Sequence, residues 1–179
     1  MESNQMKINI TRSLSIVAIF IMISCGFYSF QGNIPSHLKT LYLDVFQNRS
    51  VEFQIETRIY DQFYERLTRE GLLNLVTVKK EADSYIEGEI QSIKDNPFTF
   101  DENENILEYK LEITCSITWY DAKLDKELFK KTIKSSIAYY SETENSNLAS
   151  TDQKTRETAM EEALELLTDN LIAAMTEDW

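Results

Sequence analysis

Two long stretches that alternate apolar and polar side chains, residues 106–120 and 126–140, constrain the fold more than any other part of the sequence. A period of two is typical of a β-strand with one buried face and one exposed face. The turn-like residues 121–125 lie between them, so we expect one antiparallel hairpin. The face expected to be buried carries Leu107, Tyr109, Leu111, Ile113, Cys115, Ile117 and Trp119 on the first strand and Phe129, Ile133, Ile137 and Tyr139 on the second. The opposite face of the first strand is polar and free for contact: Glu108, Lys110, Glu112, Thr114, Ser116 and Thr118.

Two shorter segments before this hairpin are also predicted to be strands. Lys39–Phe46 alternates and is predicted to be central in the sheet, because both of its faces carry apolar groups. Its one face carries Leu41, Leu43 and Val45, and its other face carries Tyr42 and Phe46. The segment 83–94 also alternates, and residues 95–104, which are acidic and include Pro97, are predicted to form a long connection.

Two segments have the period of an amphipathic helix. In Glu52–Arg69 apolar residues recur every four positions, and Gly71 is a suitable C-terminal cap. This stripe consists of Ile55, Ile59, Phe63 and Leu67. The second helix is predicted to begin after a capping box of Ser150 and Gln153 and to run to about Glu177. The sequence therefore predicts an α+β fold in the order β-α-β-β-β-α, with a four-stranded, mostly antiparallel sheet and two helices packed on one face.

The N-terminal residues have the layout of a secretory signal peptide. Lys7 and Arg12 precede an apolar run of ten residues, Leu14–Ile23, and the run ends at Ser24 and Cys25. A cysteine at this position is the acceptor for a diacylglyceryl group in bacterial lipoproteins, so residues 1–24 are predicted to be the signal peptide and Cys25 the lipidation site. An uncleaved anchor and an ordinary buried segment are the alternatives, although a spanning helix needs about 20 apolar residues.

The rest of the chain is predicted to be an extended lead-in, residues 25–38, followed by a single domain, residues 39–179. The whole chain has a formal charge of −12, and residues 1–24 contribute +1, so the mature part has a charge of −13. Such a charge opposes binding to nucleic acid and to anionic lipid. Attachment to a membrane is therefore expected to depend on the lipid at Cys25.

The sequence shows no motif of an enzyme, metal site or cofactor site. It holds one histidine, His37, with no nucleophile motif, and it lacks the metalloprotease, CxxC, phosphate-loop and dinucleotide patterns. We interpret His37 as a surface polar residue and Cys115 as a small buried strand residue. The chain is therefore predicted not to be an enzyme and to need no metal or cofactor.

Several residues together resemble the LptE family of lipopolysaccharide-assembly lipoproteins, particularly its Bacteroidetes-type members. The opening Cys25–Phe30, with the sequence CGFYSF, is the sharpest point of the resemblance, and the strand Ile86–Ile90 (IEGEI) is the second. Gly32, Ile34-Pro35, the alternating hairpin and a long acidic helix close to Trp179 follow the same order. The resemblance implies two helices on a four-stranded sheet, which agrees with the fold predicted above.

The resemblance also implies a location and a partner. Such proteins are lipid-anchored to the outer membrane on its periplasmic side, where they plug the LptD barrel, assist its assembly and support lipopolysaccharide passage to the cell surface. Lys110, Lys130 and Lys134 are the candidate contacts with lipopolysaccharide, and the simpler interpretation is that they are solvated charges. Lys130 and Lys134 share a strand face by parity, and Lys131 points the other way.

One alternative function remains open from the sequence. The chain could be an independent periplasmic lipoprotein that holds a small amphipathic ligand between the sheet and the helices. That function predicts an open apolar cavity in the domain core, and a closed core would count heavily against it, whereas the barrel-plug function predicts co-purification with the barrel and misfolding of the barrel on depletion.

Overall fold

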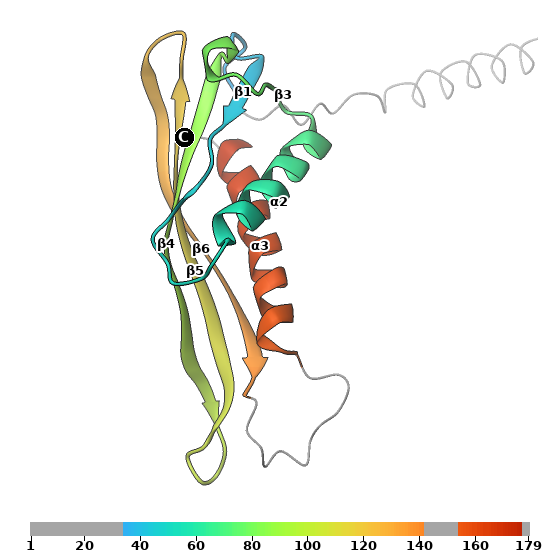
Figure 1. Cartoon of the computed structure of the whole chain (residues 1–179), viewed down its shortest axis with the longest axis vertical. Helices are drawn as coiled ribbons and strands as arrows, with labels where there is room; N and C mark the ends of the chain where they lie inside the picture. Colours follow the sequence, from blue (N-terminus) through green and yellow to red (C-terminus); the bar gives the residue numbers. More distant parts are fainter. Residues whose placement is uncertain (1–33, 142–153, 177–179) are drawn as a thin grey trace, which may run out of the picture. The chain divides into compact units, whose positions relative to one another are not determined.

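The computed structural model describes residues 34–141 and 154–176, and both helices lie on one face of a mixed sheet (Figure 1). The signal peptide, Cys25 and the predicted capping box of Ser150 and Gln153 lie outside the described residues. The elements are β1 (Thr40–Leu43), β2 (Gln47–Asn48), α2 (Ile55–Glu70), β3 (Asn74–Leu75), a 3-10 helix η1 (Lys79–Glu81), β4 (Ser84–Phe100), β5 (Ile106–Asp121), β6 (Lys126–Tyr140) and α3 (Arg156–Thr176).

The predicted α+β class with two helices is confirmed, but the predicted sheet of four mostly antiparallel strands is wrong. The sheet has six strands in the order β3-β1-β4-β5-β6, and β2 also pairs with β4. β1 runs parallel to both β3 and β4, and β2 runs parallel to β4. β2 and β3 have two residues each, so neither is long enough to produce an alternating pattern in the sequence.

The antiparallel part of the sheet matches the predicted hairpin. β5 pairs with β6 from Asp121↔Lys126 to Glu108↔Tyr140, with one register shift near Trp119. β4 is longer than predicted: residues 95–100, interpreted above as connection, continue the strand, and the turn is confined to 101–105. The proline does not break the strand because β2 pairs with β4 only as far as Ile90. Pro97 therefore lies on a free edge, where the sheet does not need its missing N–H.

Helix α2 begins later than predicted. Residues 51–54 form a turn in which the Asn48 amide donates to the Glu52 carbonyl (2.8 Å) and its oxygen accepts from the Ser50 N–H (2.9 Å). Gln54 then has a left-handed φ of 58°, which no helical residue has, so the helix starts at Ile55. At the other end Gly71 has a φ of 62° and its N–H bonds to the Leu67 carbonyl, as the sequence predicts.

One contiguous core lies between the helices and the sheet. The apolar stripe of α2 and the odd-numbered residues of β5 from Leu111 to Trp119 are buried, as predicted, but the prediction that Leu107 is buried is wrong, since it is 43 % exposed near the β4–β5 turn. The prediction that Val45 shares a face with Leu43 is wrong: Val45 is 60 % exposed and Phe46 is buried. β1 ends at Leu43, so the alternation does not continue through the link to β2, and the Phe46 ring turns inward over Gly88.

The N-terminus of α3 is fixed to the sheet by a charged cluster. The Thr155 hydroxyl accepts a bond from the Thr158 N–H and so caps the helix. Arg156 binds Asp95 of β4 (2.9 Å) and also Glu52 before α2, and the Tyr139 hydroxyl donates to Asp95 (2.9 Å). Burial, and then the bond to Asp95, raises the pKa of Tyr139 to about 12. The cluster therefore joins the β2–α2 turn, the sheet and α3.

Candidate functional site

The sheet face opposite the helices is a candidate interaction surface, and we call it the outer face. It carries the even-numbered side chains of β5, those of β6 from Lys130 to Tyr140, and Tyr85, Glu87 and Glu89 of β4. No described helix or strand covers it, since both helices lie on the other side (Figure 1). The prediction of a polar face on β5 is confirmed, although Thr114 is only 8 % exposed because β4 and β6 flank it.

Charges on the outer face are largely paired with one another. Glu87 binds Lys79 (2.9 Å), Glu89 binds Arg49 (2.8 Å) and Glu112 binds Lys134 (3.2 Å). These pairs are exposed, so each adds little stability. The face is therefore hydrophilic and rich in hydrogen-bonding groups without being a strong basic or acidic patch.

The three candidate lysines share this face. Lys130 lies opposite Thr118, Lys134 opposite Thr114, and Lys110 opposite Ala138, whereas Lys131 lies opposite Ile117 on the core side. Lys134 is bound to Glu112, and the Lys110 ammonium lies 5.3 Å from the centre of the Phe98 ring. Lys130 makes no ion pair or hydrogen bond with any described residue. The parity predicted from the sequence is thus confirmed, and the contact with lipopolysaccharide remains a prediction.

Two aromatic side chains lie at the end of the outer face that is nearest the β4–β5 turn. Tyr140 pairs with Glu108, and the Lys110 ammonium lies over the Phe98 ring; these aromatic side chains are 42 % and 51 % exposed. Phe100, near the same turn, is 55 % exposed. Exposed aromatic groups are typical of interaction surfaces. The placement of Phe98 and Phe100 was not predicted because residues 95–104 were interpreted as a connection, where a pattern of side-chain faces has no meaning.

A second apolar feature lies in the turn before α2. Val51 and Phe53 are 94 % and 86 % exposed, although Asn48 and Glu52 hold the backbone around them in place. A rigid turn that presents two apolar side chains to solvent loses little conformational entropy on binding. The sequence analysis placed Phe53 in a helix and so did not recognise this turn.

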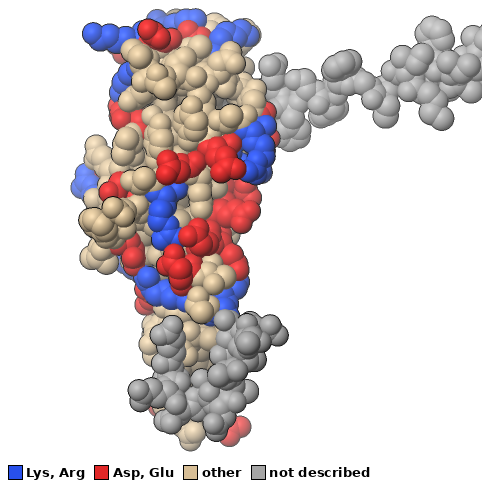
Figure 2. Space-filling model, turned by 45° about the vertical axis from the view of Figure 1, so that its right-hand side comes forward, with Lys and Arg blue, Asp and Glu red and all other residues tan. Residues whose placement is uncertain are grey.

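On the helix-covered side, acidic and basic side chains alternate (Figure 2). Arg58 of α2 binds Glu157 (3.0 Å) and Glu161 of α3, and Arg66 binds Asp169 (3.0 Å). These bridges hold α2 against α3. The two helices together carry nine Asp and Glu residues and four Arg residues, so this side is acidic overall.

A polar cluster fixes the lead-in to the sheet. His37 binds Asp121, whose side chain is fully buried, and the Lys123 ammonium donates to the His37 carbonyl (3.1 Å). Burial opposes ionisation of Asp121, but the bonds from His37 and from two backbone N–H groups outweigh it and lower its pKa. His37 is 40 % exposed, so the prediction of a surface polar residue is confirmed, and the structure adds its role in fastening the lead-in.

Asp83 completes this cluster and makes it sensitive to acid. The bond from Lys123 (2.8 Å) and the backbone N–H groups of Lys39 and Thr40 lower its pKa from 3.8 to about 2. Since the folded-state pKa is depressed, Asp83 stabilises the fold above pH 4, and this contribution is lost as the pH falls from about 4 to about 2.

We therefore expect Asp83→Asn to lower the free energy of unfolding at pH 7 by about 1–2 kcal/mol, because a unit of pKa corresponds to about 1.4 kcal/mol. Urea titrations between pH 7 and pH 2.5 measure the difference between variant and wild type, which should shrink below pH 4. The control is Asp61→Asn, an exposed carboxylate on α2 without a described partner. A difference for Asp83→Asn that is constant over this pH range would contradict the assignment.

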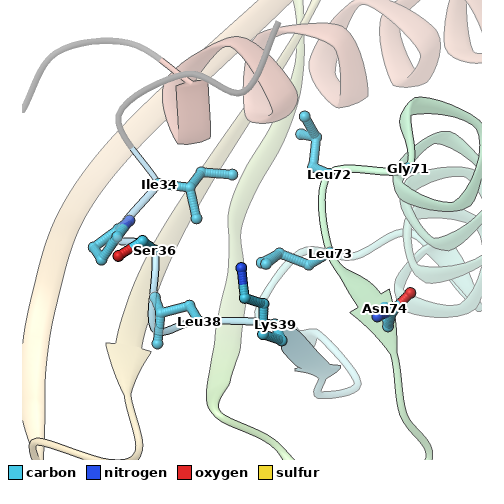
Figure 3. A pocket seen from close by; sticks show the side chains of 9 residues that line it. Ile34, Ser36, Leu38, Lys39, Gly71, Leu72, Leu73 and Asn74 are labelled. Atoms are coloured by element: carbon cyan, nitrogen blue, oxygen red, sulfur yellow. The ribbon is translucent and has the colours of Figure 1, made fainter. Parts of the chain in front are cut away.

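The described concavities lie on the surface and not between the sheet and the helices. One, of about 260 Å³, is lined by the lead-in and the segment around β3, including Ile34, Leu38 and Leu73 (Figure 3). Another lies between the charged sides of α2 and α3, and a third on the outer face. The core side chains between the layers are fully packed, which argues against a ligand held there.

Chemical reactivity is low in the described residues. Cys115 is a free thiol, fully buried as predicted, and burial raises its pKa to about 12, so it stays protonated. Within residues 34–141 and 154–176 no group of three or more His, Cys, Asp or Glu side chains is placed to hold a metal ion. Neither of the described helices is both long and apolar enough to cross a membrane.

Two helices on one face of a mixed sheet, with the other face open and polar, define a two-layer α+β domain whose uncovered sheet is its candidate interaction surface. The chain belongs to the LptE lipopolysaccharide-assembly family, whose family model matches residues 38–175. At the level of the family, this membership assigns it to lipopolysaccharide assembly. No curated protein is similar enough in sequence to count as a match.

Solved structures support the fold. A hypothetical protein from Chlamydia trachomatis has a TM-score of 0.57 and 10 % identity, covering 78 % of this chain and 96 % of that one. Rare lipoprotein B from Shewanella oneidensis has a TM-score of 0.52 and 17 % identity, with 76 % and 93 % covered. The PelC dodecamer from Paraburkholderia phytofirmans has a TM-score of 0.55 and 7 % identity, with 81 % and 94 % covered. At these identities the likeness concerns the fold alone.

Proposed function

We propose that this domain is the plug of an LptD-type outer-membrane barrel and assists the assembly of that barrel. The observation that carries the proposal is the outer face, because the interior of an outer-membrane barrel is polar and a plug must match it with hydrogen-bonding groups. The paired charges on Glu87, Glu89 and Glu112 provide such a surface without a strong field of one sign. Membership of the lipopolysaccharide-assembly family supports the same role.

The aromatic end of the outer face and the turn of Val51 and Phe53 add the apolar anchors that stable interfaces need. We propose that Phe98, Phe100 and Phe53 pack against the barrel and that the hydrophilic middle of the face lines its lumen. The closed core opposes the alternative of an independent lipoprotein with a ligand between the sheet and the helices.

We propose further that Cys25 is lipidated and holds the domain at the periplasmic side of the outer membrane, since an acidic domain has no electrostatic attraction to anionic lipid. His37 and Lys123 fasten the start of the described domain to the sheet. Lipopolysaccharide is the candidate ligand of Lys110, Lys130 and Lys134, and Lys130 is the strongest of the three because it has no described partner.

Site-specific photocrosslinking in cells tests the plug. A photoreactive residue at Thr118, on the outer face between Glu87 and Lys130, is expected to capture the barrel protein, and Thr118 is preferable to Thr114, which is nearly buried. The control position is Glu165, on the helix-covered side. The Cys25→Ala chain should lose palmitate labelling and capture less barrel, because the tether raises the local concentration.

Absence of the barrel from every crosslinked position would exclude the plug. Capture from Glu165 that equals or exceeds capture from Thr118 would instead assign the wall contact to the helices. Unchanged palmitate labelling in Cys25→Ala would exclude lipidation at that residue without deciding between the two faces.

A further inference from the structure

The outer edge of β6 is a second candidate binding surface of the sheet, because backbone N–H and C=O groups along it have no strand partner. β6 is the last strand in the sheet order, so one of its two edges has no neighbouring strand. The Tyr140 N–H bonds to the Lys154 carbonyl, and the Asn170 side chain reaches the Lys134 carbonyl (3.5 Å). These two bonds show that the even-numbered backbone groups of β6 point away from β5.

Apart from these two bonds, the edge of β6 from Lys130 to Tyr140 is unpaired in the described residues. The register is regular from Lys130 to Tyr140, with the one shift lying before it near Trp119. The free N–H and C=O groups belong to Lys130, Thr132, Ser136 and Ala138, and the Lys134 N–H is free as well. At about 3.3 Å per residue, positions 130–138 offer roughly 26 Å of regular edge. Such an edge is a template for another strand unless something prevents pairing.

The charge of β6 limits which strand fits. The strand carries Lys126, Lys130, Lys131 and Lys134 and only one acidic residue, Glu127, although the whole chain has a net charge of −12. Lys130 and Lys134 project on the outer face, beside the place where an added strand would present its own side chains. Opposite charges across neighbouring strands stabilise pairing, and like charges oppose it.

The lysines disfavour several registers in which a second copy of this chain would pair with the edge. Antiparallel self-pairing centred on Lys130, Thr132 or Lys134 places a lysine directly opposite a lysine, whereas a register centred on Ile133 does not. A register centred on Ser136 requires the Tyr140 backbone, whose N–H is already bonded to Lys154. The lysines thus oppose self-association and favour an acidic partner.

We propose that the β6 edge, residues 130–138, binds an extended acidic segment of a partner polypeptide, which adds to the sheet as a seventh strand. The backbone ladder would supply affinity, and carboxylates facing Lys130 and Lys134 would select the sequence. This site differs from the proposed barrel contact in using backbone groups at the edge of the sheet, and it shares Lys130 and Lys134 with the outer face.

A model peptide tests the edge directly. The probe is a nine-residue peptide in which Glu alternates with Thr or Val, and its control carries Lys in place of every Glu. With the acidic peptide, residue-resolved amide exchange should slow at least about fivefold at Lys130, Thr132 and Ser136, since these N–H groups gain acceptors. The Ile133 N–H, which already faces β5, should not change.

Three variants distinguish the contribution of the β6 backbone to peptide binding from the contribution of the lysine charges. Thr132→Pro removes one outward N–H without touching the β5–β6 ladder and should weaken peptide binding at least about tenfold. Thr132→Ala is its matched control and should stay within about twofold. Lys130→Glu with Lys134→Glu keeps the backbone intact and should also weaken binding at least about tenfold, and thermal melts verify that each variant is folded.

Several results would overturn the proposal: equal binding of the acidic and basic peptides, wild-type affinity in Thr132→Pro, or edge protection that rises with protein concentration in the absence of peptide. The last result would make a second copy the occupant.

Discussion

Phe63→Ala is expected to lower the free energy of unfolding by about 3–5 kcal/mol, a large part of the stability of a domain of this size. The Phe63 side chain is completely buried in the α2 stripe, and its ring lies edge-on to Phe46, with centroids 6.2 Å apart and planes at 79°. Truncation removes this contact and leaves a cavity between α2 and the sheet, where the closely packed neighbours cannot move in to fill it.

The matched control is the same substitution ten residues earlier. Phe53 is 86 % exposed in the turn before α2, so Phe53→Ala should change the free energy of unfolding by less than about 0.5 kcal/mol. Urea denaturation followed by circular dichroism measures both variants. Equal losses would mean that the Phe53 ring is buried in solution, and a small loss at Phe63 would mean that the core is not packed as described.

The two phenylalanines also separate stability from function. Phe53→Ala is expected to reduce capture of the barrel from Thr118 while the domain stays folded. Phe63→Ala should reduce capture only through the loss of folded protein, so lowering the temperature should restore it.

The sequence predicted the long elements well because their patterns extend over many residues. The strand 126–140 has the predicted bounds, and the residues from Leu111 to Trp119 alternate over enough positions to fix which face is buried. The helix α2 shows the same effect, with four buried residues at a spacing of four. In each case burial is periodic, and a periodic pattern is what a sequence displays directly.

The short and irregular parts could not be predicted in this way. β2 and β3 exist because parallel neighbours pair with them across the sheet, which is a long-range fact without a local signal. Pro97 suggested a break in β4, yet a free edge tolerates proline. Val45 and Phe46 exchange faces because the chain changes direction between β1 and β2, and alternation applies only inside a strand.

The candidate site shows the same difference between what long, periodic strands reveal and what short or irregular segments hide. The outer face and the shared side of Lys130 and Lys134 follow from parity within long strands. Phe98 and Phe100 were not predicted because they lie on the part of β4 that was interpreted as a connection. The exposed Phe53 and the fastening of His37 to Asp121 depend on where irregular segments meet the sheet. Surfaces on strands with an unbroken alternating pattern can thus be predicted from a single sequence, whereas those formed by irregular segments cannot.

The contact of Phe46 with Gly88 predicts the second large loss of stability, that of Gly88→Ala. A Cβ placed on Gly88 would lie 2.3 Å from Cε1 and 2.4 Å from Cδ1 of the Phe46 ring, far inside van der Waals distance. Phe46 is 2 % exposed and held against Phe63, so the ring has no free space into which to move. We expect Gly88→Ala to lower the free energy of unfolding by about 1–3 kcal/mol through overpacking.

A double-mutant cycle identifies the cause. In a Phe46→Ala background the ring is gone, so Gly88→Ala should become neutral or stabilising, as alanine usually is relative to glycine within a strand. The coupling energy should then be about 1–3 kcal/mol. Gly71→Ala is the control: it has open space but a φ of 62°, so it should cost about 1 kcal/mol in either background. A cost for Gly88→Ala that is the same with and without the ring would contradict the packing of Phe46 over β4, and with it the explanation of why Val45 faces solvent.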